Sequence, residues 1–212
     1  MLGDGSLTFR EFVMKEPAPL AVVHDSILEF LRGRDDAVVF GAQAVNAYVD
    51  SPRMTQDVDV VSNNAEELAE QLRQHLGDQF PIAVRVRKVG DGVGYRIYQL
   101  TKPKHRHLVD IRQADVLPSS RRIGGILVVA PVELVACKVI AYWRRKGKPK
   151  AGTDWRDIAL LLLTFPELRS EEGSVLQWLE AENVAEEVLE VWRQLVAEEI
   201  FPDEEDDEFL HK

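Results

Sequence analysis

The chain has little cysteine, with Cys137 alone among 212 residues. An internal disulfide is therefore excluded, and a reducing compartment is favoured. Long apolar runs are also lacking, because the most apolar stretch, residues 158–165, is far too short to span a bilayer. The N-terminus carries Asp4, Arg10 and Glu11 where a signal peptide would need an apolar run. We therefore expect a cytoplasmic protein with no membrane segment.

The composition shows no bias toward collagen-like, low-complexity or disordered chains, since 45% of the residues are hydrophobic and 29% are charged. A formal net charge of -10 at first argues against nucleic acid as a partner. The charge is unevenly distributed, however. Residues 85–150 include 16 basic and 4 acidic residues, whereas residues 180–208 include 1 basic and 13 acidic residues. The net charge therefore excludes nothing about a nucleic acid-binding face in the central segment.

Hydrophobic periodicity predicts an α+β sheet domain followed by helices. The expected regions are an α/β core at 1–130, a helical region at 131–202 and an acidic tail at 203–212. In the core, helices are predicted at 20–32, 42–48 and 65–75, and strands at 37–40, 57–61, 82–89, 95–100, 107–112 and 125–129. In the helical region, helices are predicted at 132–146, 154–164, 174–181 and 184–200, with a loop at 147–152.

The sharpest chemical feature is the segment 53–61, Arg-Met-Thr-Gln-Asp-Val-Asp-Val-Val. Residues i and i+2 of a strand project from one face, so Asp57 and Asp59 would lie side by side. Two carboxylates that close repel each other unless a cation lies between them, and Mg²⁺ favours such oxygen ligands. Asp110, embedded in apolar residues, would add a third carboxylate from a neighbouring strand. The alternative is that these acids lie at strand edges and face water.

A glycine stands between a predicted strand and a predicted helix. Gly41 follows the strand at 37–40, and a glycine there lets backbone N–H groups approach a phosphate at a helix N-terminus. An ordinary strand-to-helix turn would show the same pattern. His107, which precedes Asp110, lacks cysteine partners and zinc spacing and is interpreted as an edge-strand or phosphate-facing residue.

In this order, the features resemble nucleotidyltransferases of the DNA polymerase β-like superfamily, and most of all its AbiEii-type branch, which is related to toxin–antitoxin systems. The resemblance implies an α+β fold with a mixed sheet, flanking helices and a C-terminal helical part. It covers most of residues 36–165. The matching motifs are Gly41-Ala42-Gln43-Ala44, Arg53-x-Thr55-x-Asp57-x-Asp59, Asp110, Leu134-Val135-Ala136-Cys137-Lys138 and Thr153-Asp154-Trp155-Arg156-Asp157-Ile158.

The resemblance implies a metal-dependent enzyme that transfers NMP from an NTP to an acceptor hydroxyl. The acceptor would be RNA, such as a tRNA 3′ end, or a protein, and an antitoxin is a further implied partner. Catalysis and binding of Mg²⁺ or Mn²⁺ would fall to Asp57, Asp59 and Asp110. Nucleotide binding would fall to Gly41, Ala42, Arg53, Thr55 and Lys138.

Several charged residues of the helical region have both a structural and a functional interpretation. Lys138 lies on the apolar stripe of its predicted helix, where an ammonium must either snorkel to water or meet an anion. Asp154 and Asp157 would either complement a helix N-terminus or position Lys138 or another basic side chain. A basic run is either a solvated loop or a phosphate-binding element, and it consists of Arg144, Arg145, Lys146, Lys148 and Lys150.

One position departs from the resembled family, which usually has Gly-Gly or Gly-Ser where this chain has Gly41-Ala42. Ala42 has no hydroxyl to offer a phosphate. This departure motivates an alternative hypothesis of another class. In it, the chain is an inactive protein with the nucleotidyltransferase fold that binds partners through its acidic C-terminal helices.

Overall fold

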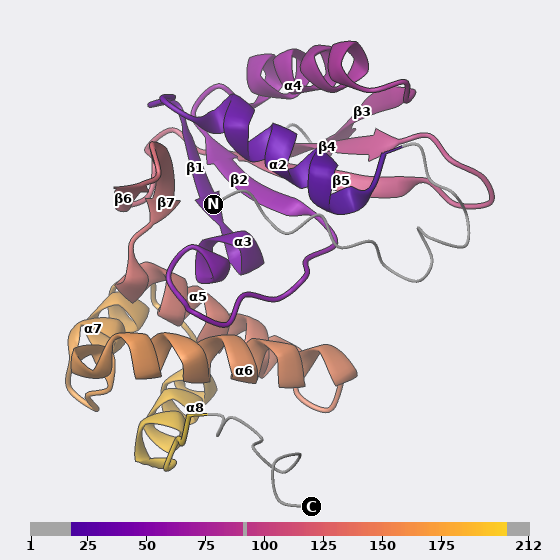
Figure 1. Cartoon of the computed structure of the whole chain (residues 1–212). Helices are drawn as coiled ribbons and strands as arrows, with labels where there is room; N and C mark the ends of the chain where they lie inside the picture. Colours follow the sequence, from indigo (N-terminus) through magenta and orange to yellow (C-terminus); the bar gives the residue numbers. More distant parts are fainter. Residues whose placement is uncertain (1–17, 91–92, 203–212) are drawn as a thin grey trace, which may run out of the picture. The chain divides into compact units, whose positions relative to one another are not determined.

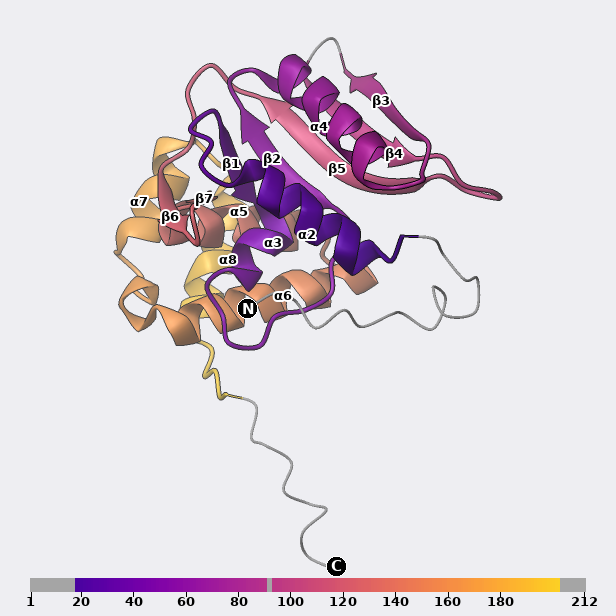
Figure 2. The ribbon, with the colours of Figure 1, turned by 45° about the horizontal axis from the view of Figure 1, so that its top comes forward.

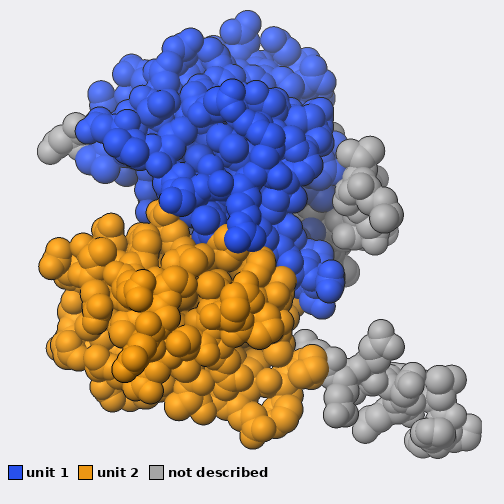
Figure 3. Space-filling model, turned by 90° about the vertical axis from the view of Figure 1, so that its left-hand side faces the viewer, with its two compact units in different colours: residues 1–130 blue, residues 131–212 orange. Residues whose placement is uncertain are grey.

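The computed structural model describes residues 18–90 and 93–202 of the chain. The chain divides into two compact units, unit 1 at residues 1–130 and unit 2 at residues 131–212 (Figure 3). The acidic tail that the sequence predicts at 203–212 lies outside the described residues. Within the described ranges, no helix has the length and apolar character needed to cross a membrane.

Unit 1 is built on a seven-stranded mixed sheet in the order β3-β4-β5-β2-β1-β7-β6 (Figure 1). β2 pairs in parallel with β5, and β1 with β7, whereas the other neighbours are antiparallel. The predicted α+β class is confirmed. The strands are β1 (Ala37–Phe40), β2 (Val58–Ser62), β3 (Val84–Val89), β4 (Gly94–Gln99), β5 (Arg106–Gln113), β6 (Ser120–Ile123) and β7 (Ile126–Val129).

The core of unit 1 lies on one face of the sheet, under α2 (Leu20–Leu31) and α4 (Ala65–Gln79) (Figure 2). β2 alternates as its sequence predicts, with Val58 and Val60 buried in this core and Asp59 half-buried on the opposite face. The buried helix residues that pack there include Val23, Ile27, Leu31, Leu68, Leu72 and Leu76. The helices therefore leave the opposite face of the sheet to the carboxylates.

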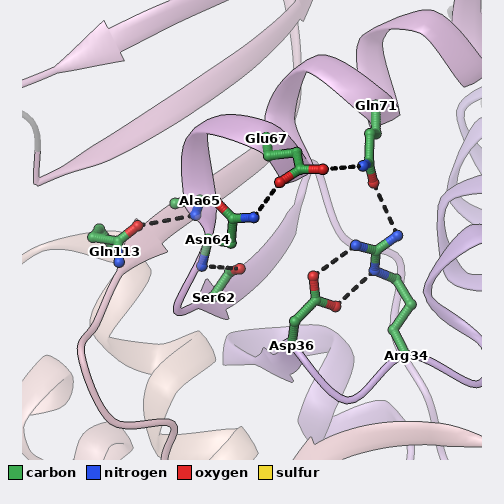
Figure 4. A network of polar contacts seen from close by, with 8 residues as sticks. All are labelled: Arg34, Asp36, Ser62, Asn64, Ala65, Glu67, Gln71 and Gln113. Atoms are coloured by element: carbon green, nitrogen blue, oxygen red, sulfur yellow. Dashed lines mark hydrogen bonds and ion pairs between the residues drawn. The ribbon is translucent and has the colours of Figure 1, made fainter.

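A polar network closes the end of the sheet at which β2 and β5 finish (Figure 4). The backbone N–H of Ala65, the first residue of α4, donates to Gln113 Oε1 at 2.9 Å. A side chain of β5 thus caps α4 in place of Asn64, whose own side chain makes no capping hydrogen bond. Beside it, Arg34 donates to Asp36 at 2.6 Å and to Gln71 at 3.0 Å. These bonds link the segment before β1, α4 and the end of β5. They lie at the end of β2 and not at its start, where Asp57 and Asp59 are.

Unit 2 is helical. The predicted loop at 147–152 is wrong beyond residue 148, because α6 already begins at Pro149. Proline suits a first helical position, where its missing N–H would have no partner in any case. The helices are α5 (Pro131–Arg144), α6 (Pro149–Thr164), the 3₁₀ helix η1 (Pro166–Leu168), α7 (Ser174–Ala181) and α8 (Glu186–Ala197). Buried side chains from them include Leu134, Val139, Ile158, Leu161, Leu179 and Trp192.

Candidate active site

Two aspartates meet on the face of the sheet opposite α2 and α4. Asp59 of β2 lies directly beside Asp110 of β5 in the parallel register, and both residues are half-buried. Their neighbours Val58 and Val109 are also in register and are buried in the core. Because side chains alternate along a strand, the two carboxylates project from the same face.

The third predicted aspartate comes from a different setting. Asp57 precedes β2 by one residue, so it is not part of the strand that the sequence predicts at 57–61. Its Oδ2 lies 2.9 Å from Nδ1 of His107, and Nε2 of the same ring lies 3.0 Å from the carbonyl oxygen of Val109. Burial lowers the pKa of His107, but the contacts with Asp57 and Val109 outweigh it and hold the pKa above its ordinary value. A protonated ring donates to both acceptors and so positions the Asp57 carboxylate.

Arg96 positions Asp110. It lies opposite Asp110 in the antiparallel pairing of β4 with β5, and its Nε donates to Asp110 Oδ2 at 3.1 Å. The charge of Asp110 raises the pKa of the Arg96 guanidinium above its ordinary value. Sequence reasoning missed this residue, as it missed the contact of His107 with Asp57. Both contacts depend on the register between strands, which the local sequence pattern does not contain.

Gly41 makes room for Asp59. Its φ is +69°, a left-handed conformation that side chains rarely adopt. A Cβ at this position would lie 2.1 Å from Asp59 Oδ2. From the sequence, Gly41 is expected to let a phosphate approach the backbone. The structure gives a further reason for glycine at this position, because the Asp59 carboxylate occupies the space that a side chain would need. The next residue, Ala42, is half-buried.

Two side chains of α3 (Gly41–Asn46) hold the segment that leads to Asp57. Asn46 Oδ1 accepts from the backbone N–H of Arg53 at 3.0 Å, and Asn46 Nδ2 donates to the carbonyl oxygen of Arg53 at 2.7 Å. Gln43 Nε2 donates to the hydroxyl of the buried Thr55 at 2.9 Å. In this structure, Arg53 and Thr55 therefore help to set the path of the backbone before Asp57. A role for them in nucleotide binding stays a prediction.

Unit 2 contains two ion pairs that involve predicted site residues. Lys138 Nζ donates to Asp157 Oδ2 at 2.6 Å, and both side chains are buried. Arg145 Nη1 contacts the two carboxylate oxygens of the buried Asp154 at 2.8 and 2.7 Å. Because α6 begins at Pro149, neither aspartate belongs to its first turn, and the reading as helix N-terminal charges is wrong. Of the two readings, the structure shows the pairing with basic side chains.

The basic run contains four exposed residues and one that has a structural contact. Arg145 is held by Asp154. The four exposed members lie at the end of α5, on the turn between α5 and α6 and at the start of α6, and they are Arg144, Lys146, Lys148 and Lys150. We define these four residues as the basic turn.

The carboxylates suit a divalent cation in chemistry and in strand position. They offer hard oxygen ligands of the kind that Mg²⁺ and Mn²⁺ take. Asp59 and Asp110 are in register, and Gly41 leaves space at the Asp59 carboxylate. Within residues 18–90 and 93–202, no group of three or more His, Cys, Asp or Glu side chains is already arranged around a metal position. Asp57 and Asp110 contact His107 and Arg96 instead.

Comparisons with known proteins agree with this arrangement. A family model described as "Nucleotidyl transferase AbiEii toxin, Type IV TA system" matches residues 28–210. The Megavirus polyadenylate synthase has a similar structure, with a TM-score of 0.55 and 16% identity over 70% of this chain, which spans 32% of the viral chain. JHP933 from Helicobacter pylori has a TM-score of 0.53 and 14% identity, with 91% of this chain and 92% of that chain covered. No curated protein sequence matches. The structural likeness shows a polymerase β-like nucleotidyltransferase fold.

Proposed function

This chain belongs to the AbiEii nucleotidyltransferase family, and from that membership we propose that it transfers NMP from an NTP to a hydroxyl of RNA, such as a tRNA 3′ end. Nucleotidyl transfer is the reaction class of the family, which favours an enzyme over the inactive binding protein that Ala42 suggests. The observation that carries the proposal is the register of Asp59 with Asp110, with Gly41 opening space at Asp59.

Charge supports RNA as the acceptor. Residues 85–150 include 16 basic and 4 acidic residues. Phosphate contacts made by such residues supply most of the non-specific affinity of proteins for nucleic acid.

Asp57, Asp59 and Asp110 are the residues that would hold Mg²⁺ or Mn²⁺. When bound, a divalent ion supplies positive charge at the phosphate that is transferred. His107 holds the Asp57 carboxylate in a defined orientation through a contact of 2.9 Å, and Arg96 does the same for Asp110 through a contact of 3.1 Å. They thereby reduce the conformational freedom that these carboxylates would lose on binding the ion.

In unit 2 we propose that Lys138 contacts the triphosphate of the NTP and that the basic turn contacts RNA phosphates. An ammonium has three N–H donors, and the bond to Asp157 uses one of them. Asp157 thus fixes the direction of the ammonium and leaves it donors for an anion. The four residues of the basic turn are exposed, as phosphate contacts require.

Transfer of a radiolabelled nucleotide tests the reaction. The wild type, mixed with each of the four NTPs, Mg²⁺ or Mn²⁺ and total tRNA, is expected to label the RNA. Asp110→Asn is expected to lose about 100-fold or more of the rate, because the variant lacks a charged ligand. The control is Asp115→Asn, which changes an exposed aspartate close by in the sequence and should label RNA as the wild type does. If only protein is labelled, the acceptor is protein and the proposal of an RNA acceptor is wrong. If nothing is labelled with any NTP, the proposed reaction itself is wrong.

We further propose that the chain is the toxin of a toxin–antitoxin pair, as the description of its family states. Expression of the wild type is then expected to arrest bacterial growth, and co-expression of an antitoxin is expected to restore it. Asp59→Asn at the same expression level should permit growth. If the wild type and this variant are equally toxic, the toxicity does not depend on nucleotidyl transfer and the proposed link between the two is wrong.

A further inference from the structure

The face of the sheet that carries Asp59 continues into a row of arginines. Asp59 lies beside Asp110, Asp110 lies opposite Arg96, and Arg96 lies opposite Arg87 of the edge strand β3. Residues that are paired in register project from the same face. With neighbouring strands about 4.8 Å apart, this row extends about 14 Å from Asp59 to Arg87.

A second row runs alongside the first. Arg85 of β3 lies opposite Tyr98 of β4, and Tyr98 lies opposite His107 of β5. The rings of Tyr98 and His107 stack with their centroids 5.1 Å apart, and His107 contacts Asp57. Each row therefore begins at a candidate catalytic aspartate and ends at an arginine of β3.

The core of unit 1 does not use this face. α2 and α4 cover the opposite face, where Val84, Val86 and Ile97 pack (Figures 1 and 2). Arg85 and Arg87 are exposed, and their side chains make no ion pair or hydrogen bond with any residue in the described part of the chain. The Arg96 side chain is 42% exposed.

Stability alone does not explain these arginines. Arg87 and Arg96 lie directly opposite each other, and like charges in that position destabilise a strand pair. Asp110 offsets the charge of Arg96 only, since its ion pair is with that residue. Charge on an edge strand does protect it from pairing with other chains, and Lys88, which is exposed on the other face of β3 with its Nζ 5.8 Å from the centroid of the Tyr95 ring, also supplies such a charge. An anion bound between Arg87 and Arg96 would attract both side chains and offset their repulsion.

We propose that β3, β4 and β5 form the surface that binds the single-stranded end of the acceptor RNA. Arg85, Arg87 and Arg96 would contact its phosphates, and Tyr98 would stack on a base. Proteins hold single strands in this way, with a basic surface along the backbone and aromatic rings beneath the bases. The inference rests on the proposed function, because the aspartates at which the rows begin are the candidate catalytic residues.

A binding measurement without NTP tests this surface. The probe is a fluorescein-labelled single-stranded RNA of roughly 12 nucleotides, a length within the range that single-strand binding proteins cover. Its anisotropy is followed over a series of salt concentrations. The variant is Arg85→Gln with Arg87→Gln, and the matched control is Lys88→Gln, which removes a charge from the same strand on its opposite face. All three side chains are exposed, and thermal unfolding checks that each variant folds.

The double variant is expected to bind about tenfold or more weakly at low salt. Its plot of log affinity against log salt should be shallower by about 1.4, which is about 0.7 for each lost phosphate contact to a single strand. Lys88→Gln should bind as the wild type does. As a second measurement, RNA with a photoreactive uridine should cross-link to β3, β4 or β5 of the wild-type protein, at residues 84–89, 94–99 or 106–113.

Several results would overturn the RNA surface. They are no RNA binding by the wild type, equal losses in the double variant and in Lys88→Gln, or cross-links that lie outside β3, β4 and β5. A preference for an acidic protein over RNA would count against it in the same way. Transfer activity is measured separately, so the two proposals can fail independently. If the double variant binds and labels RNA as the wild type does, the surface is wrong and the reaction stands. If RNA binds to this face and no NTP is transferred, the reaction is wrong and the surface stands.

Discussion

The aspartates of the sheet in unit 1 and those of α6 in unit 2 are the same residue type in opposite environments. The Asp110 side chain is 22% exposed, and Asp59 beside it is half-buried. Asp154 and Asp157 are buried, and each is paired with a basic side chain of its own unit. A carboxylate on an accessible sheet face can bind an incoming cation, whereas a buried and paired one holds its partner in place. Both sets have basic partners, so burial is what distinguishes them.

The largest effect on stability is expected from Asp157→Ala. Lys138 would remain buried without its counter-charge, and breaking a buried ion pair in this way costs about 3–5 kcal/mol. Urea unfolding measures the loss. The double variant Lys138→Met with Asp157→Leu removes both charges and should recover most of the stability. If the double variant is as unstable as Asp157→Ala, the loss comes from packing and not from the unpaired charge. The aspartates of α6 would then differ less from those of the sheet than we infer.

A smaller loss of stability is expected from Gly41→Ala. The left-handed backbone costs a residue with a Cβ about 1–2 kcal/mol, and the added carbon would also displace the Asp59 carboxylate. Transfer activity should therefore fall by more than the loss of folded protein explains. Gly77→Ala in α4 is the matched control, since a Cβ there meets nothing within 4 Å. That control should be stabilised by up to about 1 kcal/mol, and equal loss of activity in both variants would contradict the role of Gly41.

The smallest effect is expected from the half-exposed pair of Arg34 with Asp36. The hydrogen bond from Arg34 lowers the pKa of Asp36 below its ordinary value of 3.8. The pair therefore stabilises the fold above the pKa of the unfolded chain, and this contribution is lost as the pH falls below about 3.8 through the folded pKa. At this exposure it amounts to about 0.2–1 kcal/mol. Asp36→Asn should reduce stability by that amount at pH 7 and by less at pH 2, as measured by urea unfolding at both values.

Local patterns in the sequence predict the strands of the candidate site and the carboxylates on them. Alternation around Asp59 and the apolar neighbours of Asp110 suffice for this, because one buried face imposes a period of two. Gly41 is predicted as a special backbone position, since few other residues fit a left-handed turn. The strand β6 was not predicted, because its residues are polar and belong to an exposed edge.

The contacts between elements could not be predicted. The pairing of Arg96 with Asp110 and that of His107 with Asp57 depend on strand register, which tertiary packing sets. The start of α6 was misplaced because glycine and proline in 147–152 are typical of a loop. A proline at the first helical position and the burial of Ala151 offset the cost of Gly152 within the helix.

The most direct test of the difference between the two sets of aspartates is Asp59→Asn, studied for transfer rate and for unfolding free energy together. If Asp59 acts on the reacting phosphate, the rate should fall by about 10³-fold, or about 4 kcal/mol in the barrier, while the unfolding free energy changes by less than about 1 kcal/mol. Asp115→Asn should change neither quantity. Nucleotide transfer by Asp59→Asn at the rate of the wild type would contradict the assignment of the sheet carboxylates to catalysis.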